Sequence, residues 1–331
     1  MKRTNIKDLA KLLSLNPSTI SRALSDHPDI SIETKDRVKK AAEEFKYIPN
    51  LHAKYFRQKN SGLIALILPE FYMFFAPSLM DGINKVLSNS GYSIIIFISN
   101  NTFIKEKEIV RHCLSWVVEG VLMAVSENTE STEHLLALKH ANIPVVLLDK
   151  VIMSSEYSTI TIDDRKAAFE ATSFLVGRGH SNILGVFGNP KLEITKERII
   201  GFKEALIHNN VPHSEYDIIC VNDAEKMEFY LEDKLRTTPF NGLFIMSDEL
   251  LFNVYPCVRK LNLYPNQLSI ISISDGKLPF NLYPKITHIK HSGFEIGKMA
   301  AEVLLSEIKS YDGIISHNKM ETFLIELGSV K

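Results

Sequence analysis

Apolar side chains in the first fifty residues have the spacing of three short helices. Positions i, i+3, i+4 and i+7 are apolar over 6–13, which predicts an amphipathic helix there. A second helix is predicted over 17–24, because Asn16 can accept N–H bonds at its start and proline suits its first position. A third is predicted after Ser31, which can cap it. One small core is expected from Ile6, Leu9, Ala10 and Leu13; Ile20, Ala23 and Leu24; and Val38, Ala41, Ala42 and Phe45.

The second predicted helix has a polar outer face. At 100° per residue, Ser18, Ser21, Arg22 and Ser25 lie opposite the apolar stripe, with Thr19 on the flank. Hydroxyls and a guanidinium are groups that read base edges in a DNA groove. Two helices joined by a tight turn, with this face outward, predict a helix-turn-helix. The alternative is a solvated helix face in a small bundle.

From Leu63 onward, short apolar runs alternate with amphipathic segments. This order predicts doubly wound parallel sheets, and the strands are too many for one sheet, so two α/β lobes are expected. An edge strand is predicted near the end of the chain, within 321–331. Buried strands are predicted at 63–68, 93–98, 120–125, 144–148, 159–162, 183–187, 217–221, 242–246 and 268–272, and helices at 105–118, 166–177 and 198–209.

The net charge of −1 conceals an uneven distribution. Residues 1–60 hold 13 Lys and Arg against 7 Asp and Glu, a net charge of +6, while the other 271 residues hold 25 against 32. A basic head on an acidic body is typical of a module that binds a polyanion, although a solvated lysine-rich face gives the same count.

Other compositional features limit the function classes. No apolar run is long enough to cross a bilayer, and the N-terminus MKRTNIKDLA has no signal-peptide pattern, so we expect a cytoplasmic protein with no membrane partner. Cys113, Cys220 and Cys257 lack metal-ligand spacing and are expected to be buried thiols.

Pro49 ends the third predicted helix, and Asn50 can cap a new one. Leu51 to Arg57 can form about two turns, and a helix that short is marginal in water. We expect this segment to order against DNA or a second copy of the chain. A plain tether ending at Gly62 is the alternative.

These segments carry a family resemblance. The order NIKDLAKLLSLNPSTISRAL, SIETKDRVKKAAEEFKYIPN and LHAKYFR resembles the DNA-binding head and hinge of the LacI (lactose repressor) family of transcription regulators. The resemblance implies a small all-α helix-turn-helix head and a periplasmic-binding-protein-like core of two doubly wound lobes. The expected boundaries are a head at 1–48, a hinge helix and linker at 49–61, and a core at 62–331, with one lobe at about 62–160 and 291–319 and the other at about 161–290 and 320–331.

The resemblance also implies DNA contacts. Residues matching Ser18, Thr19 and Arg22 work in the major groove in that family, and Asn50 and Ala53 are expected along the minor groove. Phe56 stands where the family usually has a leucine wedge, and phenylalanine can also unstack a base step. The full set of expected DNA contacts is Thr4, Ser18, Thr19, Ser21, Arg22, Asn50, Ala53 and Phe56.

Candidate ligand contacts follow from the predicted sheets. Ligands of such sheets bind beyond the carboxyl ends of the strands, so polar and aromatic residues after each apolar run are candidates, and they suit a sugar-like effector. Asp163, which follows a strand too, is as well suited to capping the next helix. The expected contacts are Phe71, Tyr72, Phe75, Ser99, Asn100, Ser126, Asp149, Lys150, Ser247, Asp248, Ser274, Asp275 and His291, with Arg198 added by the resemblance.

Some positions depart from the family pattern. Lys150 stands where arginine is frequent, His291 where glutamine often lines the cleft, and Ser272 and Ile273 where glycine and an aromatic residue are common. Lysine is a point charge and not a bidentate fork, so no familiar member's effector is transferred.

Enzyme motifs are absent from the sequence: it has no phosphate loop, no GxGxxG after a strand, no GxSxG elbow and no metal-ligand spacing. A solute receptor would share the core but would need an export signal, and a sugar-processing enzyme would need a paired acid and base. We therefore expect a homodimeric, sequence-specific regulator, a repressor, that binds a palindromic operator and needs no cofactor or metal. A small-molecule effector in the interlobe cleft, a sugar or sugar derivative, would set its affinity for DNA.

Overall fold

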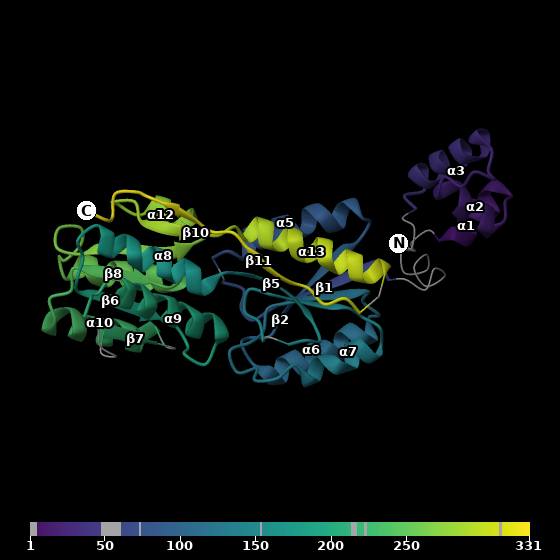
Figure 1. The fold of residues 1–331 in the computed structure, drawn as a ribbon. Helices are drawn as coiled ribbons and strands as arrows, with labels where there is room; N and C mark the ends of the chain where they lie inside the picture. The colour runs from purple at the N-terminus through teal and green to yellow at the C-terminus, as the bar shows by residue number, and fades with distance from the viewer. Residues whose placement is uncertain are drawn as a thin grey trace. The chain divides into compact units, whose positions relative to one another are not determined.

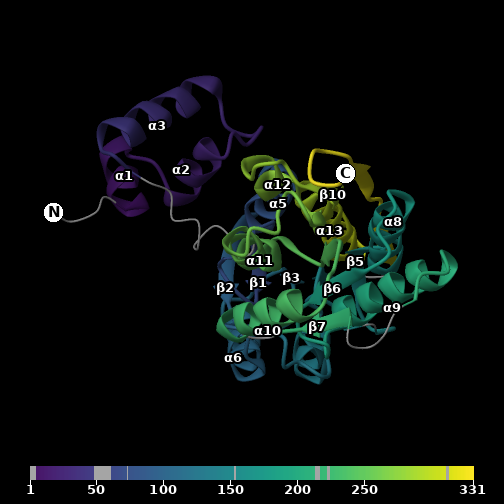
Figure 2. The same cartoon turned by 90° about the vertical axis from the view of Figure 1, so that its left-hand side faces the viewer.

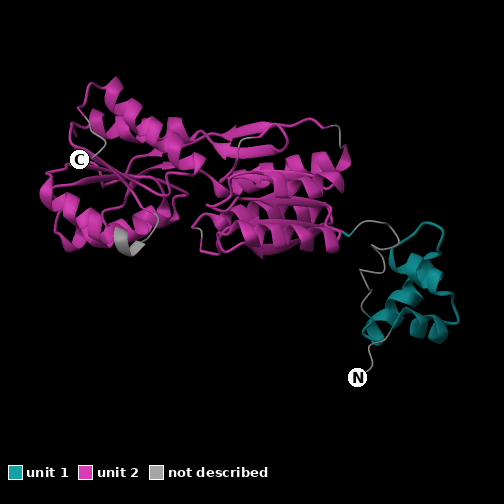
Figure 3. Ribbon diagram, turned by 90° about the horizontal axis from the view of Figure 1, so that it is seen from below, with its two compact units in different colours: residues 1–61 teal, residues 62–331 magenta. Residues whose placement is uncertain are grey.

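The chain divides into two compact units, residues 1–61 and residues 62–331 (Figure 3). The computed structural model describes residues 5–47, 61–72, 74–152, 154–212, 217–221, 224–310 and 313–331, and the side chains of all of these except 224–226. Thr4, Asn50, Ala53, Phe56 and the predicted hinge helix lie outside the described residues.

The first unit contains three helices, as predicted: α1 (Ile6–Leu13), α2 (Pro17–Leu24) and α3 (Ile32–Glu44). Asn5 and Asp8 form a capping box at α1, and the Ser31 hydroxyl accepts the Thr34 N–H at the start of α3. Asn16 precedes α2, but its side chain accepts no capping hydrogen bond from the described residues, so the prediction for that side chain is wrong.

The core of this unit contains Leu9, Ala10, Ile20, Ala23, Val38, Ala41 and Ala42, all from the predicted stripes. Phe45 is the exception, with 41% of its surface exposed. It follows the last residue of α3, where the chain leaves the helix, so the helical periodicity no longer places it on the buried face.

The second unit contains two six-stranded sheets (Figures 1 and 2). The first has the order β11-β5-β4-β3-β1-β2, and all its pairs are parallel. Its strands are β1 (Leu63–Leu68), β2 (Ser93–Ile98), β3 (Gly120–Met123), β4 (Val145–Leu148), β5 (Ser158–Ile162) and β11 (His317–Met320). We call this half the N-lobe.

The second sheet, that of the C-lobe, has the order β12-β10-β9-β8-β6-β7 and is parallel except for β12. Its strands are β6 (Ile183–Phe187), β7 (Ile218–Cys220), β8 (Gly242–Ile245), β9 (Ser269–Ser274), β10 (Thr287–Lys290) and β12 (Phe323–Ile325). Every predicted strand is present, and β12 is the predicted edge strand. The strands β10 and β11, which are short and carry polar residues, were not predicted.

The helices of the second unit cover both faces of each sheet. They are α5 (Ala76–Asn89), α6 (Phe103–Ser115), α7 (Leu136–His140), α8 (Asp164–Gly177), α9 (Glu193–His208), α10 (Ala224–Thr237), α11 (Asp248–Lys260), α12 (Lys277–Asn281) and α13 (Gly293–Lys309), with one 3₁₀ turn at Glu133–Leu135. Strand residues alternate between the two layers: Ile64 and Leu66 pack in one core cluster, and Ala65 and Ile67 in another.

The chain crosses between the lobes three times, between Ile162 and Asp164, between Lys290 and Gly293, and between Met320 and Phe323. Close packing of α5 against α13 supports the N-lobe after the second crossing. A Cβ on Gly82 would lie 2.0 Å from the Phe294 carbonyl oxygen, and one on Gly297 would lie 2.2 Å from that of Leu79. Glycine is therefore required at both positions for the helices to approach this closely.

Cys113 and Cys257 are buried as expected, but Cys220 is exposed. It is the last residue of β7, a strand of three residues at the edge of the sheet. None of the helices in the described residues combines the length and apolar character that a membrane crossing requires.

Candidate functional site

The outer face of α2 in the first unit is open to solvent. Ser18 and Arg22 are exposed, and Thr19 and Ser21 are half-buried at the margins. The Arg22 side chain is 58% exposed, and its Nη1 lies 4.0 Å from Asp29 Oδ2. An exposed pair at this distance is weak, so the guanidinium is available to another acceptor. The predicted reading face is thus solvent-facing, with Ile20 and Ala23 fully buried beneath it.

The turn between α2 and α3 is held by a lysine. Lys35 Nζ donates to the Asp26 carbonyl at 3.2 Å and lies 3.2 Å from Asp26 Oδ1, and its side chain is largely covered. Asp26 has a left-handed backbone, with φ of 57°. Lys35 therefore links α3 to the turn that follows α2.

A cavity of about 320 Å³ lies in the second unit where the two sheets face each other. Its walls come from the segments just after the carboxyl ends of strands, as expected for parallel sheets. Glu70 and Phe75 follow β1, Glu127 follows β3, and Asp149 and Lys150 follow β4. The C-lobe contributes Gly188 and Asn189 after β6, Met246 to Glu249 after β8, and His291 after β10.

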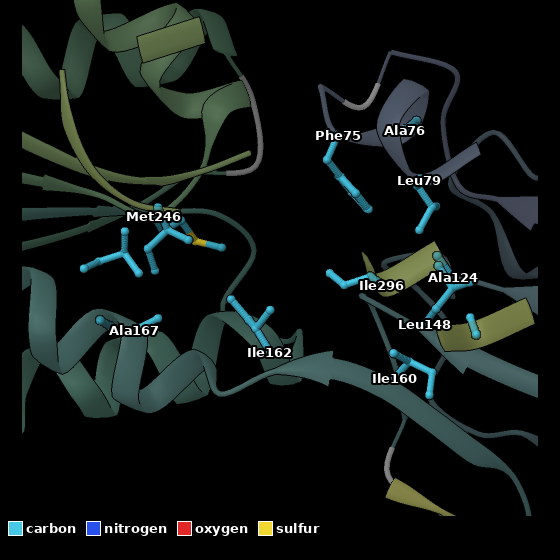
Figure 4. Close-up of a cluster of buried hydrophobic side chains, with 14 of the residues drawn as sticks. Phe75, Ala76, Leu79, Ala124, Leu148, Ile160, Ile162, Ala167, Met246 and Ile296 are labelled. Atoms are coloured by element: carbon cyan, nitrogen blue, oxygen red, sulfur yellow. The ribbon is translucent and has the colours of Figure 1, made fainter. Parts of the chain in front are cut away.

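The cavity brings together seven of the fourteen expected ligand contacts: Phe75, Asp149, Lys150, Arg198, Ser247, Asp248 and His291. Phe75 and Met246 line it from opposite lobes (Figure 4). Ser247 also caps α11, because its hydroxyl accepts the Leu250 N–H.

The other seven expected contacts lie elsewhere. Phe71 and Tyr72 pack edge to face on the surface, and Tyr72 is 88% exposed. The hydroxyls of Ser99 and Ser126 are 2.6 Å apart and buried, so each satisfies the other. Asn100 is exposed in a left-handed turn, Ser274 accepts the Gly276 N–H, and Asp275 bridges the two lobes.

Several cavity residues were not predicted. Glu127 and Asn189 follow strands and satisfy the same rule as the predicted contacts, so that signal was available. Glu249 and Asn253 lie on α11, a helix that was not among those predicted. Apolar walls come from Leu192, Ile194, Val221, Met227, Met246, Leu250 and Ile273, residue types that sequence reasoning assigns to a core by default.

Arg198 is fixed by the protein. Its Nε donates to Asp164 Oδ1 at 2.8 Å, its Nη2 lies at the same distance from that oxygen, and its Nη1 donates to the Met246 carbonyl. The side chain is buried, so this ion pair joins the starts of α8 and α9 to the end of β8 at the cavity wall. Asp163, next to Asp164, caps α8 through the Lys166 N–H, so the two adjacent carboxylates have separate roles.

Burial is the main cause of the pKa shifts of Asp149, Asp248 and His291 at the cavity. It raises the pKa of Asp149 to about 6 and that of Asp248 to about 6, since a carboxylate loses its hydration there. Burial, with the nearby charge of Arg198 and of His288, lowers the pKa of His291 to about 3. His291 is therefore neutral at physiological pH. Asp149 also has a left-handed backbone, with φ of 57°.

Hydrogen bonds join the lobes around the cavity. The Phe74 N–H donates to Glu249 Oε1 at 3.1 Å, and Asn189 Nδ2 donates to Glu127 Oε2 at 3.2 Å. The rings of Phe74 and Phe252 also pack across the boundary, with centroids 5.8 Å apart. The described arrangement is therefore one in which both lobes share contacts at the cavity rim.

A helix-turn-helix unit joined to a two-lobed body of parallel sheets defines the class of bacterial DNA-binding transcription regulators with a periplasmic-binding-protein-like core. Residues 5–50 match the model for bacterial regulatory proteins of the lacI family, and residues 172–330 match the periplasmic binding protein-like domain. The head and the core of the chain are therefore similar to the two parts of LacI-family regulators.

Curated relatives align with nearly the whole chain. Catabolite control protein A of Priestia megaterium is 28% identical over 307 residues, which are 90% of this chain and 91% of the relative. The transcriptional repressor PurR of Vibrio atlanticus is 25% identical over 332 residues, 98% of each chain. The regulator MalR of Streptococcus pneumoniae is 28% identical over 332 residues, 96% of this chain and 98% of the relative. These relatives are transcription regulators and not enzymes.

Solved structures share the fold. The lac repressor dimer bound to operator and the anti-inducer ONPF matches with a TM-score of 0.85 at 18% identity, over 99% of each chain. The complex of the regulator CelR with cellobiose matches with a TM-score of 0.72 at 20% identity, over 99% of this chain and 100% of that one.

Proposed function

We propose that the protein represses transcription as a homodimer on a palindromic operator, and that a sugar-like effector in the cavity between the lobes sets its affinity for DNA. The carrying observation is the solvent-facing α2, with Ser18 and Arg22 outward, in a chain whose second unit encloses a cavity with polar groups at strand ends. Both features belong to one chain, so binding at one site can be coupled to binding at the other.

The reading role of α2 is supported by its side chains. Arginine can donate two hydrogen bonds to guanine, and serine or threonine hydroxyls pair with several bases. The positive charge of residues 1–60 adds attraction to phosphate, which is independent of sequence. Arg22 and Ser18 therefore account for specificity, and the surrounding lysines account for affinity.

A homodimer is supported by geometry and by exposed apolar surface. One head of this size reads one half-site, so a palindrome requires two. The edge strand β2 leaves Ile96 exposed, and Trp116 and Val117, just after α6, are exposed in the same lobe. Phe252 and Tyr283 are exposed in the C-lobe. The lac repressor structure that shares this fold is a dimer bound to operator.

A sugar-like effector is supported by the composition of the cavity. Carboxylates, two amides and an imidazole line the cavity together with the Phe75 ring and apolar walls, a combination that orients a polyhydroxylated ring. Two structures with this fold were solved with sugars, one with cellobiose and one with ribose.

The test uses the full chain and fluorescently labelled duplexes selected from a random palindromic library. Anisotropy titrations at several salt concentrations compare the selected operator with a scrambled duplex of equal length. Specific binding should exceed non-specific binding by about 10³-fold or more. Equal affinity for both duplexes at every salt concentration would refute the proposal.

Arg22→Ala provides the side-chain test, with Arg37→Ala as a control of equal charge change on the exposed surface of α3. Arg22→Ala should reduce the ratio of specific to non-specific affinity about 10-fold or more, because a base contact is lost. Arg37→Ala should leave that ratio unchanged.

A further inference from the structure

The cavity contains more negative than positive charge. Five carboxylates line it, those of Glu70, Glu127, Asp149, Asp248 and Glu249, against the two permanent cations Lys150 and Arg198. Both cations are already engaged. Lys150 Nζ lies 3.7 Å from Glu127 Oε1, and Arg198 is held by Asp164 and the Met246 carbonyl. An anionic ligand would therefore meet no uncommitted cation among the described residues of the wall.

Three of the carboxylates form a cluster that spans both lobes. Asp149 belongs to the N-lobe, and Asp248 and Glu249 belong to the C-lobe. The charge of Glu249 acts on both of the others and raises the pKa of each. Among the described residues, no lysine, arginine or histidine nitrogen lies within 4.0 Å of any of the three. The described arrangement of the lobes thus brings like charges together. Lys150 and Arg198 offset part of this charge at Asp149, but neither forms an ion pair with any of the three carboxylates.

Two buried polar atoms at the cavity also lack hydrogen-bond partners in the described residues. They are Asp248 Oδ1 and His291 Nδ1. Asp248 is only 5% exposed, and its other oxygen accepts the Asp275 N–H at 3.1 Å. The Ser274 hydroxyl also interacts with this carboxylate. Oδ1 nevertheless has no hydrogen-bond partner of good geometry among the described residues, so its position at a cavity wall points to a ligand that supplies a donor.

We propose that the effector carries a protonated amine, seated at the cluster of Asp149, Asp248 and Glu249, on a hydroxyl-bearing ring of amino-sugar size. This inference rests on the proposed function, because it specifies the ligand of the same cavity. An ammonium group supplies positive charge and three donors, which the cluster lacks. The hydroxyls reach Asn189 and His291 Nδ1, and the ring packs against Phe75.

Charge also explains what the cavity excludes. Sugar phosphates and sugar acids would add a negative group to a surface already in excess of carboxylates, and desolvation within the cavity strengthens that repulsion. A neutral sugar would form hydrogen bonds without relieving the repulsion between Asp149 and the C-lobe pair. The amine does both, so it favours the closed arrangement of the lobes.

The experiment is calorimetric titration of the full chain at pH 7.5 with compounds that differ mainly in charge. Glucosamine, galactosamine and mannosamine are cationic, glucose, galactose, mannose and N-acetylglucosamine are neutral, and glucuronate and glucose 6-phosphate are anionic. At least one amino sugar should bind 10-fold or more tightly than its neutral counterparts, and the anions should not bind detectably.

Two isosteric variants test whether the carboxylate cluster binds the amine. Asp149→Asn and Asp248→Asn each remove one charge without changing size, and asparagine tolerates the left-handed backbone at position 149. Each should weaken binding of the amino sugar about 10-fold or more. Asp233→Asn, on the exposed face of α10, is the matched control and should leave binding unchanged.

The inference is overturned if a neutral or anionic compound binds more tightly than the aminated ones, if no amino sugar binds at 10 mM, or if the two cavity variants bind as the control does. The proposed function is judged separately by operator binding without any effector. Specific operator binding combined with failure of the amino sugars would reject the amine and retain the regulator.

Discussion

The Ser78 hydroxyl donates to Asp275 Oδ2 at 2.6 Å, and this hydrogen bond joins α5 of the N-lobe to the end of β9 in the C-lobe. Asp275 Oδ1 also accepts the Gly293 N–H at 3.3 Å, where the chain enters α13 after its second crossing. One carboxylate therefore holds together two segments of the N-lobe from the opposite lobe. Asp275 was expected to contact a ligand, and in the structure its carboxylate accepts hydrogen bonds from the N-lobe.

Loss of this bridge is expected to loosen the closed arrangement. Ser78→Ala removes the donor and leaves Asp275 with one fewer partner, which should lower the free energy of unfolding by about 1–2 kcal/mol. It should also weaken the binding of any ligand that requires closure. Urea denaturation and calorimetric titration measure the two effects.

Ser88→Ala on the exposed end of α5 is the control, because Ser88 lies on the same helix away from the boundary between the lobes. Equal stability and equal ligand affinity of the two variants would contradict the bridging role.

Asp149→Asn is expected to stabilise the ligand-free protein at pH 7.5. The folded-state pKa of Asp149 is raised to about 6, so its charged form costs stability above that pH, by about 1–3 kcal/mol. The facing groups are Lys150 and Arg198, which oppose this shift, and Asp164 and Glu249, which add to it.

The pH dependence of Asp149→Asn has a defined sign. As the pH falls through 6 toward 4, the carboxyl becomes protonated in the folded state and the wild type recovers the lost stability. The difference between variant and wild type should therefore shrink over this range. A difference that stays constant or grows between pH 7.5 and 4 would show that the pKa of Asp149 is not raised in the folded protein.

His291 is expected to have the opposite effect on the pH dependence of stability, because it lowers the stability of the folded protein as the pH falls. Its folded-state pKa is lowered to about 3, with Arg198 and His288 as the facing cations. Below pH 6.5 the His291 imidazole binds a proton in the unfolded chain but not in the folded protein. The wild type therefore loses stability down to about pH 3. His291→Gln should lack this loss. Thermal unfolding of both proteins at pH 7.5, 5.5 and 4.5 measures it, and parallel curves would rule out a buried neutral imidazole.

Gly297→Ala tests the contact between α5 and α13. The added Cβ would lie 2.2 Å from the Leu79 carbonyl oxygen, so the helices must separate, and we expect a loss of about 2 kcal/mol or more. Gly177→Ala is the matched control, since nothing lies within 4 Å of a Cβ there and alanine favours a helix. The control should be neutral or stabilising, and a Gly297→Ala variant as stable as the control would contradict the packing described.

Hydrophobic spacing is sufficient to predict most of the fold. The runs at 63–68 and 183–187 are buried strands because each has a continuous apolar sequence, and parallel strands are covered on both faces. Strand β11, with sequence HNKM, was missed because it lies at a sheet edge, where polar side chains are tolerated. Phe45 was placed wrongly because helical periodicity does not mark the residue at which a helix ends.

The candidate site could also be predicted in part from the sequence, through the positions of the strand ends. The strand-end rule placed Asp149, Asp248 and His291 in the cavity, since it depends on topology alone. It could not separate residues that face a ligand from those that satisfy each other. Ser99 and Ser126 follow β2 and β3, the two strands that flank β1, as the rule requires, yet they form a hydrogen bond with each other. That pairing depends on side-chain directions, which one sequence does not encode in a readable pattern.

We propose that the outer face of α2 reads operator sequence and that a molecule in the cavity controls its affinity for DNA. The affinity of the full chain for the selected operator, measured by anisotropy with and without a compound that calorimetry shows to bind the cavity, tests this coupling. We predict a change of 5- to 150-fold in operator affinity, equivalent to about 1–3 kcal/mol, which Arg22→Ala reduces to the change seen with scrambled DNA. An operator affinity that is the same with the cavity filled and empty would show that the cavity does not control DNA binding.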